Sequence, residues 1–98
     1  KYIHLAAVFA CNFTNQMFSI AEDILKDQGL ELDLLLPLIE ETTEKIKTIS
    51  PRQAQTGPAR RGDMHVLNSH LDLLNNNPDL RSLYGDLSER ILKNNDNI

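Results

Sequence analysis

The chain has 98 residues, of which 41% are hydrophobic and 24% are charged, and its net charge is −4 at neutral pH. This length suits one domain with a modest core, and the composition is that of a soluble globular protein. The acidic balance argues against a nucleic-acid-binding surface across the whole domain. No apolar run reaches the roughly 20 residues that a membrane-spanning helix needs. The one cysteine, Cys11, has no partner for an internal disulfide, which favours a reducing compartment and hence the cytoplasm.

Residues 2 to 28 are predicted to form one long helix. Gly29 supplies its stop signal, because glycine adopts the left-handed conformation that closes many helices. A helix this apolar normally lies at the centre of a core or in an interface. The apolar residues that fill one broad arc are Tyr2, Leu5, Ala6, Phe9, Ala10, Phe13, Met17, Ile20, Ala21 and Ile24.

Three further helices follow. The second begins between Glu31 and Pro37, because proline is comfortable only in a first turn, and ends at Ser50-Pro51. Residues 51 to 62 are predicted to be a loop. Asp63 is a good N-cap for the third helix.

Asn77 caps the fourth helix, with Pro78 at its first position, and the tail from Asn94 to Ile98 is expected to fray. Trp is absent and Val is scarce, which disfavours strands. The sequence therefore predicts an all-α fold: an orthogonal or bundle-like four-helix domain around one long central first helix.

A polar stripe interrupts the apolar first helix. On an ideal helix its members fall within about 100° of arc. The plainer interpretation is a solvent-exposed face, or side chains that hydrogen-bond within the core. The sharper hypothesis is that the stripe lines a cleft against another domain. There His4 would act as a proton donor, since imidazole exchanges protons near neutral pH, and Asn12 or Asn15 would orient a substrate carbonyl or carboxylate. The stripe comprises His4, Cys11, Asn12, Asn15 and Ser19.

The segment from 51 to 62 is basic in an acidic domain, because it carries three arginines and no acid. Guanidinium groups suit phosphate or carboxylate, and the two glycines permit close backbone approach. The alternative is a solvated turn whose Asp63 only caps a helix. The three histidines and Cys11 lack metal-ligand spacing, so no metal is expected. His65 is expected to be exposed and His70 to pack beside an apolar stripe.

Three stretches together resemble the C-terminal helical domain of Rossmann-like bacterial NADP oxidoreductases of largely unassigned activity. The resemblance covers roughly residues 2 to 75. The stretches are His4-Leu5-Ala6-Ala7-Val8-Phe9-Ala10-Cys11-Asn12-Phe13, then Leu36-Pro37-Leu38-Ile39-Glu40-Glu41-Thr42, and Ala54-Gln55-Thr56-Gly57-Pro58-Ala59-Arg60-Arg61-Gly62-Asp63 followed by His70-Leu71.

The resemblance implies kinship with pyrroline-carboxylate reductases, ketopantoate reductases and the C-terminal domain of 6-phosphogluconate dehydrogenase. In such relatives a preceding dinucleotide-binding domain holds NADP or NAD, and the helical domain closes over the nicotinamide and commonly builds a dimer. Several relatives carry a Lys-x-x-x-Asn pair on the first helix. Here His4 is followed four residues later by Val8, so His4 is only a substitute proton donor and Asn12 is the nearest in-line amide. The Thr56-Gly57-Pro58 turn lies roughly where the reductases place a substrate loop.

Residues 1 to 98 are therefore interpreted as the helical substrate-binding and dimerisation domain of an NAD(P)-dependent oxidoreductase, with the nucleotide-binding domain before Lys1. The start at Lys1, without Met and directly in an apolar periodic run, agrees with a domain boundary. The substrate would be a small carbonyl, imine or hydroxyacid, and Asn15, the Thr56-Gly57-Pro58 turn, Arg61 and Asp63 are the candidate contacts. The partners expected are a second copy of the chain and the nucleotide-binding domain, with no nucleic acid and no membrane. The alternative is a non-catalytic helical interaction or assembly module of a nucleotide-binding protein, whose polar stripe and basic segment serve only assembly. A third possibility is a parent protein that binds a nucleotide as a sensor without turnover.

Overall fold

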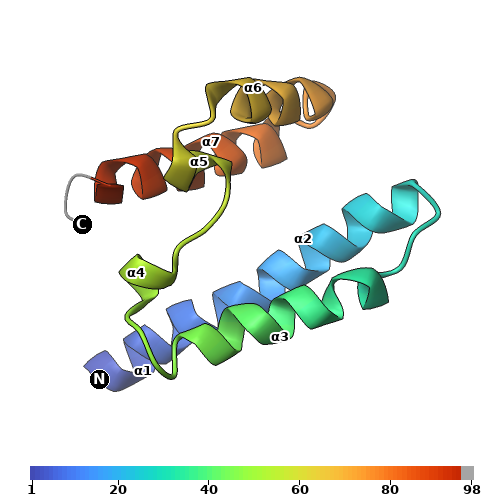
Figure 1. The fold of residues 1–98 in the computed structure, drawn as a ribbon. Helices are drawn as coiled ribbons and strands as arrows, with labels where there is room; N and C mark the ends of the chain where they lie inside the picture. The colour runs from blue at the N-terminus through green and yellow to red at the C-terminus, as the bar shows by residue number, and fades with distance from the viewer. Residues whose placement is uncertain (96–98) are drawn as a thin grey trace. The chain divides into compact units, whose positions relative to one another are not determined.

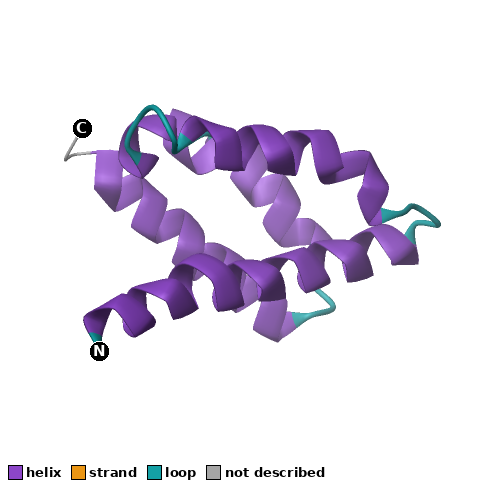
Figure 2. Ribbon diagram, turned by 90° about the horizontal axis from the view of Figure 1, so that it is seen from below, coloured by secondary structure: helices purple, strands orange, loops and turns teal. Residues whose placement is uncertain are grey.

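The computed structural model describes residues 1–95, and every regular element among them is helical (Figures 1 and 2). The all-α prediction is confirmed. In chain order the elements are α1 (Tyr2–Ala7), the π-helix η1 (Val8–Phe13), α2 (Thr14–Asp27), the 3-10 helix η2 (Leu32–Leu35), α3 (Leu36–Lys45), α4 (Pro51–Ala54), α5 (Pro58–Arg61), α6 (Met64–Leu73) and α7 (Pro78–Asn94).

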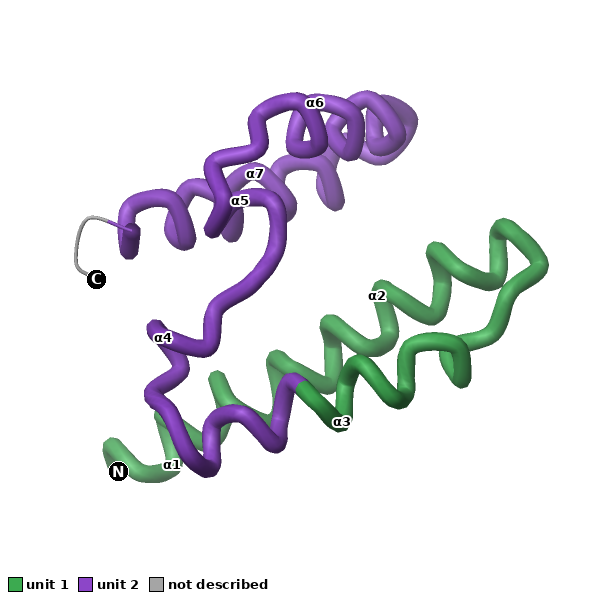
Figure 3. The backbone as a smooth tube through the Cα atoms, viewed as in Figure 1, with its two compact units in different colours: residues 1–41 green, residues 42–98 purple. Residues whose placement is uncertain are grey.

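The chain divides into two compact units, which Figure 3 colours separately. Unit 1 is Lys1–Glu41 and contains the long helical run, η2 and the first part of α3. Unit 2 is Thr42–Ile98 and contains the remaining helices. The predicted site residues consequently fall into two sets, one on each unit.

The predicted long first helix is helical without a break from Tyr2 to Asp27, but it is not α-helical throughout. Residues Val8–Phe13 form a π-helix, whose backbone bonds join residues five apart instead of four. The Thr14 hydroxyl donates to the Phe9 carbonyl oxygen, 3.4 Å away, at the same five-residue spacing. The prediction of a regular α-helix over residues 2 to 28 is therefore wrong in its middle, and the ideal helical wheel does not hold across this turn.

The predicted stop of this helix is confirmed in detail. Gly29 has φ of 72°, and the Leu30 N–H donates to the Leu25 carbonyl oxygen at 2.9 Å. The Gly29 N–H donates to the Lys26 carbonyl oxygen, also at 2.9 Å, which completes the Schellman arrangement. The chain then reverses, η2 packs against α2, and α3 begins with Pro37 in its first turn, as expected.

The prediction of a loop over residues 51 to 62 is wrong, because two single-turn helices form there. Ser50 caps α4: its hydroxyl accepts from the Gln53 N–H at 3.3 Å, and Pro51 takes the first helical position. Gly57 precedes α5 in the same way, with Pro58 first, and Gly62 closes α5 in the left-handed conformation at φ 67°. Both short helices therefore begin with proline, and α5 also ends on glycine, which is the asymmetry seen in longer helices.

Unit 2 is built around α5, α6 and α7. Asp63 caps α6 by accepting from the Val66 N–H at 3.2 Å, and Asn77 caps α7 by accepting from the Leu80 N–H at 3.2 Å, so both predicted caps are confirmed. The α5 turn contacts α6 and α7, which also contact each other. Ala59 of α5 and Leu67 of α6, each 4% exposed, are the buried hydrophobic residues of the described chain.

Candidate functional site

The polar stripe of unit 1 lies along α1, η1 and the first turn of α2. His4 is on α1, Asn12 is in the π-helix and Asn15 is in α2, and all three are exposed. Within residues 1–95, none of the three side chains makes a hydrogen bond to the protein, so all three keep their polar groups available to a ligand or a partner. Cys11 is likewise exposed and has a free thiol.

The π-turn changes the angular positions of these residues around the helix axis. An α-helix turns about 100° per residue, which would place Asn12 about 80° from His4 around the axis. Because a π-turn holds more residues per turn, Asn12 is rotated back toward the face of His4. The two side chains therefore share a face more closely than the ideal wheel indicates. They remain about 12 Å apart along the axis at α-helical rise.

An aromatic pair stands beside this stripe. The rings of Phe9 and Phe13 meet edge to face, with centroids 5.0 Å apart and planes at 87°. Their residues are 63% and 49% exposed. Such exposure is unusual for packed phenylalanines and marks a surface built for contact.

The second predicted set lies in unit 2. Thr56 and Arg61 are exposed, while Gly57, Pro58 and Asp63 are partly buried. Gly57 has φ of 100°, a conformation that side chains with a Cβ rarely adopt, so the turn before α5 depends on glycine. The Asp63 carboxylate caps α6, which is the plainer of its two predicted roles.

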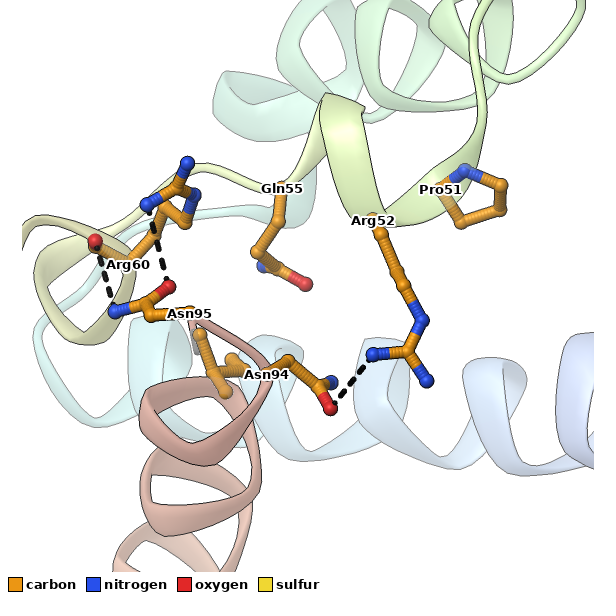
Figure 4. A pocket seen from close by; sticks show the side chains of 7 residues that line it. Pro51, Arg52, Gln55, Arg60, Asn94 and Asn95 are labelled. Carbon is orange, nitrogen blue, oxygen red and sulfur yellow. Dashed lines mark hydrogen bonds between the residues drawn. The ribbon is translucent and has the colours of Figure 1, made fainter. Parts of the chain in front are cut away.

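A pocket in unit 2 was not predicted as a site. It has a volume of about 130 Å³ and is shown in Figure 4. The Arg52 Nη1 donates to Asn94 Oδ1 at 2.9 Å, and the Arg60 Nη1 donates to Asn95 Oδ1 at 3.2 Å. The Asn95 amide in turn donates to the Arg60 carbonyl oxygen at 3.2 Å. Its lining residues are Pro51, Arg52, Gln55, Arg60, Ile91, Asn94 and Asn95.

These bonds also correct the prediction that the tail frays from Asn94. Asn94 is the last residue of α7, and both it and Asn95 are held by arginine side chains from more than 30 residues earlier. The rest of the predicted tail, residues 96 to 98, lies outside the described residues. The sequence signal for the pocket was the basic segment 51 to 62, but nothing in the pattern linked it to the asparagines of α7.

The two histidines of α6 have different surroundings. His65 is exposed, as expected. His70 Nδ1 lies 2.7 Å from the Tyr84 hydroxyl on α7, and the two rings meet edge to face with centroids 5.6 Å apart. Burial raises the pKa of the Tyr84 hydroxyl, which keeps it protonated and able to donate to the imidazole. His70 is also exposed, so its packing beside the apolar stripe stays a prediction, and its contact with Tyr84 joins α6 to α7.

Residues 1–95 contain neither a metal-binding cluster nor a membrane-spanning helix. Across residues 1–95, no group of three or more His, Cys, Asp or Glu side chains is arranged to hold a metal ion. In the same part of the chain, no helix combines the length and apolar character that crossing a membrane requires.

The comparison with known families is decisive for classification. A family model described as "Domain of unknown function (DUF2520)" matches residues 1–91. The chain belongs to the DUF2520 family. Among solved structures, this DUF2520 chain is similar to a crystal structure of the putative NADP oxidoreductase BF3122 from Bacteroides fragilis, with 47% sequence identity and a TM-score of 0.92. A search of curated proteins gave no match.

The extent of the similarity matters for its interpretation. The match covers 95% of the DUF2520 chain but only 36% of the Bacteroides fragilis chain. The sequence-based resemblance to NADP oxidoreductases is therefore confirmed for the helical domain. The activity, the substrate and the partners of a whole protein are matters for proposal.

Proposed function

We propose that this chain is the substrate-binding and dimerisation domain of an NAD(P)-dependent oxidoreductase. The observation that carries the proposal is the 47% identity, at a TM-score of 0.92, to a protein named as a putative NADP oxidoreductase. The described residues form no strand and hence no strand–glycine-loop–helix phosphate site. We therefore assign NADP or NAD to a nucleotide-binding domain that precedes Lys1 in the same polypeptide.

When bound, the nicotinamide supplies or accepts the hydride, and the substrate is a small carbonyl, imine or hydroxyacid. His4 donates or accepts the accompanying proton, because imidazole exchanges protons near neutral pH. Asn12 positions the substrate through its amide. Asn15 is a further amide contact on the same helical run.

Unit 2 carries a second set of candidate substrate contacts, which is proposed for that unit by itself. The backbone at Thr56, Gly57 and Pro58 forms the substrate loop, and the exposed Arg61 holds an anionic substrate group through its guanidinium fork. Asp63 contributes chiefly through its cap on α6, which fixes where the turn ends and leaves only one carboxylate oxygen for a ligand.

The test uses the full-length polypeptide. Titration with NADPH and NADH, followed by nucleotide fluorescence, is expected to show saturable binding, with loss of NADPH absorbance when a small carbonyl, imine or oxidised hydroxyacid is added. The proposal is refuted if the full-length protein binds neither nucleotide. It is also refuted if the native reading frame upstream of Lys1 encodes no strand–glycine-loop–helix segment. Binding without turnover across the substrate classes would favour the alternative of a nucleotide-sensing assembly module.

The dimerisation part of the proposal rests on the exposed apolar face of unit 1. Tyr2 is 79% exposed, Ile3 86% and Leu5 52%, and the Phe9–Phe13 pair continues the same helical run. Monomeric proteins rarely leave so many large apolar side chains together in water. A second copy of the chain, presenting the same face, buries them by twofold symmetry.

We expect the protein to be a dimer in sedimentation experiments at micromolar concentration. Phe9→Lys is expected to raise the dimer dissociation constant by about 30-fold or more, because central aromatic anchors contribute about 2 kcal/mol or more to an interface. Leu73→Lys is the matched control, since Leu73 is 80% exposed but lies on α6 of unit 2. A stable monomer from micromolar to millimolar concentration would count against the dimer.

A further inference from the structure

The pocket of unit 2 is lined by two arginines, and no acidic side chain among residues 1–95 lines it beside them. Arg52 and Arg60 line it, and the other lining residues are Pro51, Gln55, Ile91 and two asparagines. Among residues 1–95, the acceptors of both guanidiniums are the neutral amide oxygens of Asn94 and Asn95. In that part of the chain neither arginine forms a salt bridge.

The end of α7 does not neutralise this charge. A helix C-terminus is equivalent to about half a negative charge, whereas the two guanidiniums carry two positive charges. Counted over residues 1–95 alone, the lining of the pocket is therefore positive by more than one charge, in a chain whose net charge is −4. Capping α7 explains why an arginine lies there, but it does not explain why two arginines line one pocket.

The hydrogen-bonding groups also suit an anion. A guanidinium has five N–H donors, and Arg52 and Arg60 each use one of them to donate to an asparagine oxygen. Figure 4 shows the Gln55 side chain lying between the two arginines, so its amide faces the same space. The volume of about 130 Å³ leaves room for a group the size of a phosphate.

We propose that this pocket binds a phosphate group, either as inorganic phosphate or as a small phosphomonoester. Phosphate is favoured over carboxylate because its oxygens point in several directions, whereas a carboxylate lies in one plane and is satisfied by one guanidinium fork. Arg52 and Arg60 hold the oxygens, and the amides of Gln55, Asn94 and Asn95 surround them. This assignment is independent of the proposed oxidoreductase activity, since it concerns binding alone.

The test is a titration of the isotope-labelled full chain with inorganic phosphate at constant ionic strength, with chloride as the balancing anion. The side-chain amide signals of Gln55, Asn94 and Asn95 report binding directly. We expect saturable shifts of these signals, and a dissociation constant raised at least about tenfold by Arg52→Gln or Arg60→Gln. Arg90→Gln removes the same charge from α7 without lining the pocket, and is expected to change the constant less than about twofold.

Three results would overturn the assignment of this pocket to a phosphate group. The first is amide shifts that never saturate with phosphate. The second is a weakening of phosphate binding by Arg90→Gln equal to that by the pocket variants, and the third is acetate binding as tight as phosphate binding. Because Arg60 is partly buried, the fold of the Arg60→Gln variant is checked by circular dichroism. If that variant unfolds, the test rests on Arg52→Gln, since Arg52 is exposed. Wild-type phosphate affinity in Arg52→Gln overturns the proposal. A parallel titration with a phosphomonoester of a small alcohol distinguishes the sources: tighter binding than inorganic phosphate assigns the group to a larger ligand, and weaker binding assigns it to the free ion.

Discussion

Replacing His4 with alanine in the full-length protein is expected to lower the turnover number by about a hundredfold or more, with the affinity for NADP nearly unchanged. A positioned acid or base contributes about 10²–10⁴-fold to a proton-coupled step. The His4 side chain is exposed and makes no hydrogen bond within the described residues, so its loss should leave the fold intact. The nucleotide is assigned to the preceding domain, which explains why its affinity is spared. The measurements are kcat with the best substrate and the NADPH dissociation constant.

His65→Ala provides the matched control, because His65 is also exposed but lies on α6 of unit 2. It is expected to leave turnover within about twofold of the wild type. Unchanged turnover in His4→Ala would remove His4 from the mechanism while leaving the nucleotide-binding proposal standing.

Replacing Leu67 with alanine is expected to lower the free energy of unfolding by about 2–4 kcal/mol. Leu67 is 4% exposed and lies on α6 in the part of unit 2 where α5, α6 and α7 meet. Truncation leaves a cavity there. A loss of this size is serious, since domains are stable by only about 5–15 kcal/mol. Urea unfolding followed by circular dichroism measures the change.

Leu73→Ala serves as the control for the same chemical change on the same helix. Leu73 is 80% exposed, so its truncation is expected to cost less than about 0.5 kcal/mol. Leu67→Met, which nearly conserves volume, is expected to cost less than about 1.5 kcal/mol. Equal losses for Leu67→Ala and Leu73→Ala would mean that unit 2 is not held together by the contact around Leu67.

The features that the sequence predicted correctly are local ones. Asp63 and Asn77 cap their helices, and Gly29 closes α2, because each of these effects depends on residues within five positions along the chain. The short α4 and α5 follow the same local rules. Ser50-Pro51 and Gly57-Pro58 both carried a start signal, but the density of proline and glycine was interpreted as a loop.

The two main omissions have different physical causes. The π-turn at Val8–Phe13 has no glycine, proline or other breaker, and an ideal wheel assumes that every residue turns the chain equally. The pocket depends on contacts between residues 35 to 42 positions apart, Arg60 with Asn95 and Arg52 with Asn94. Periodicity within one helix gives no information about such pairs. The stripe residues His4, Asn12 and Asn15 are confirmed as exposed, while their roles stay predictions.

The π-turn has a consequence for how the long helix tolerates changes in length. In a regular α-helix, deleting one residue swings everything beyond it by about 100°, which exchanges one face for another. A π-turn already contains one residue more than an α-helical turn requires. Removing one residue from Val8–Phe13 would let the turn close as an α-helix while the segments on either side keep their mutual orientation. The long helix can therefore lose one residue from the turn that contains Asn12 while the segments on either side keep their orientation.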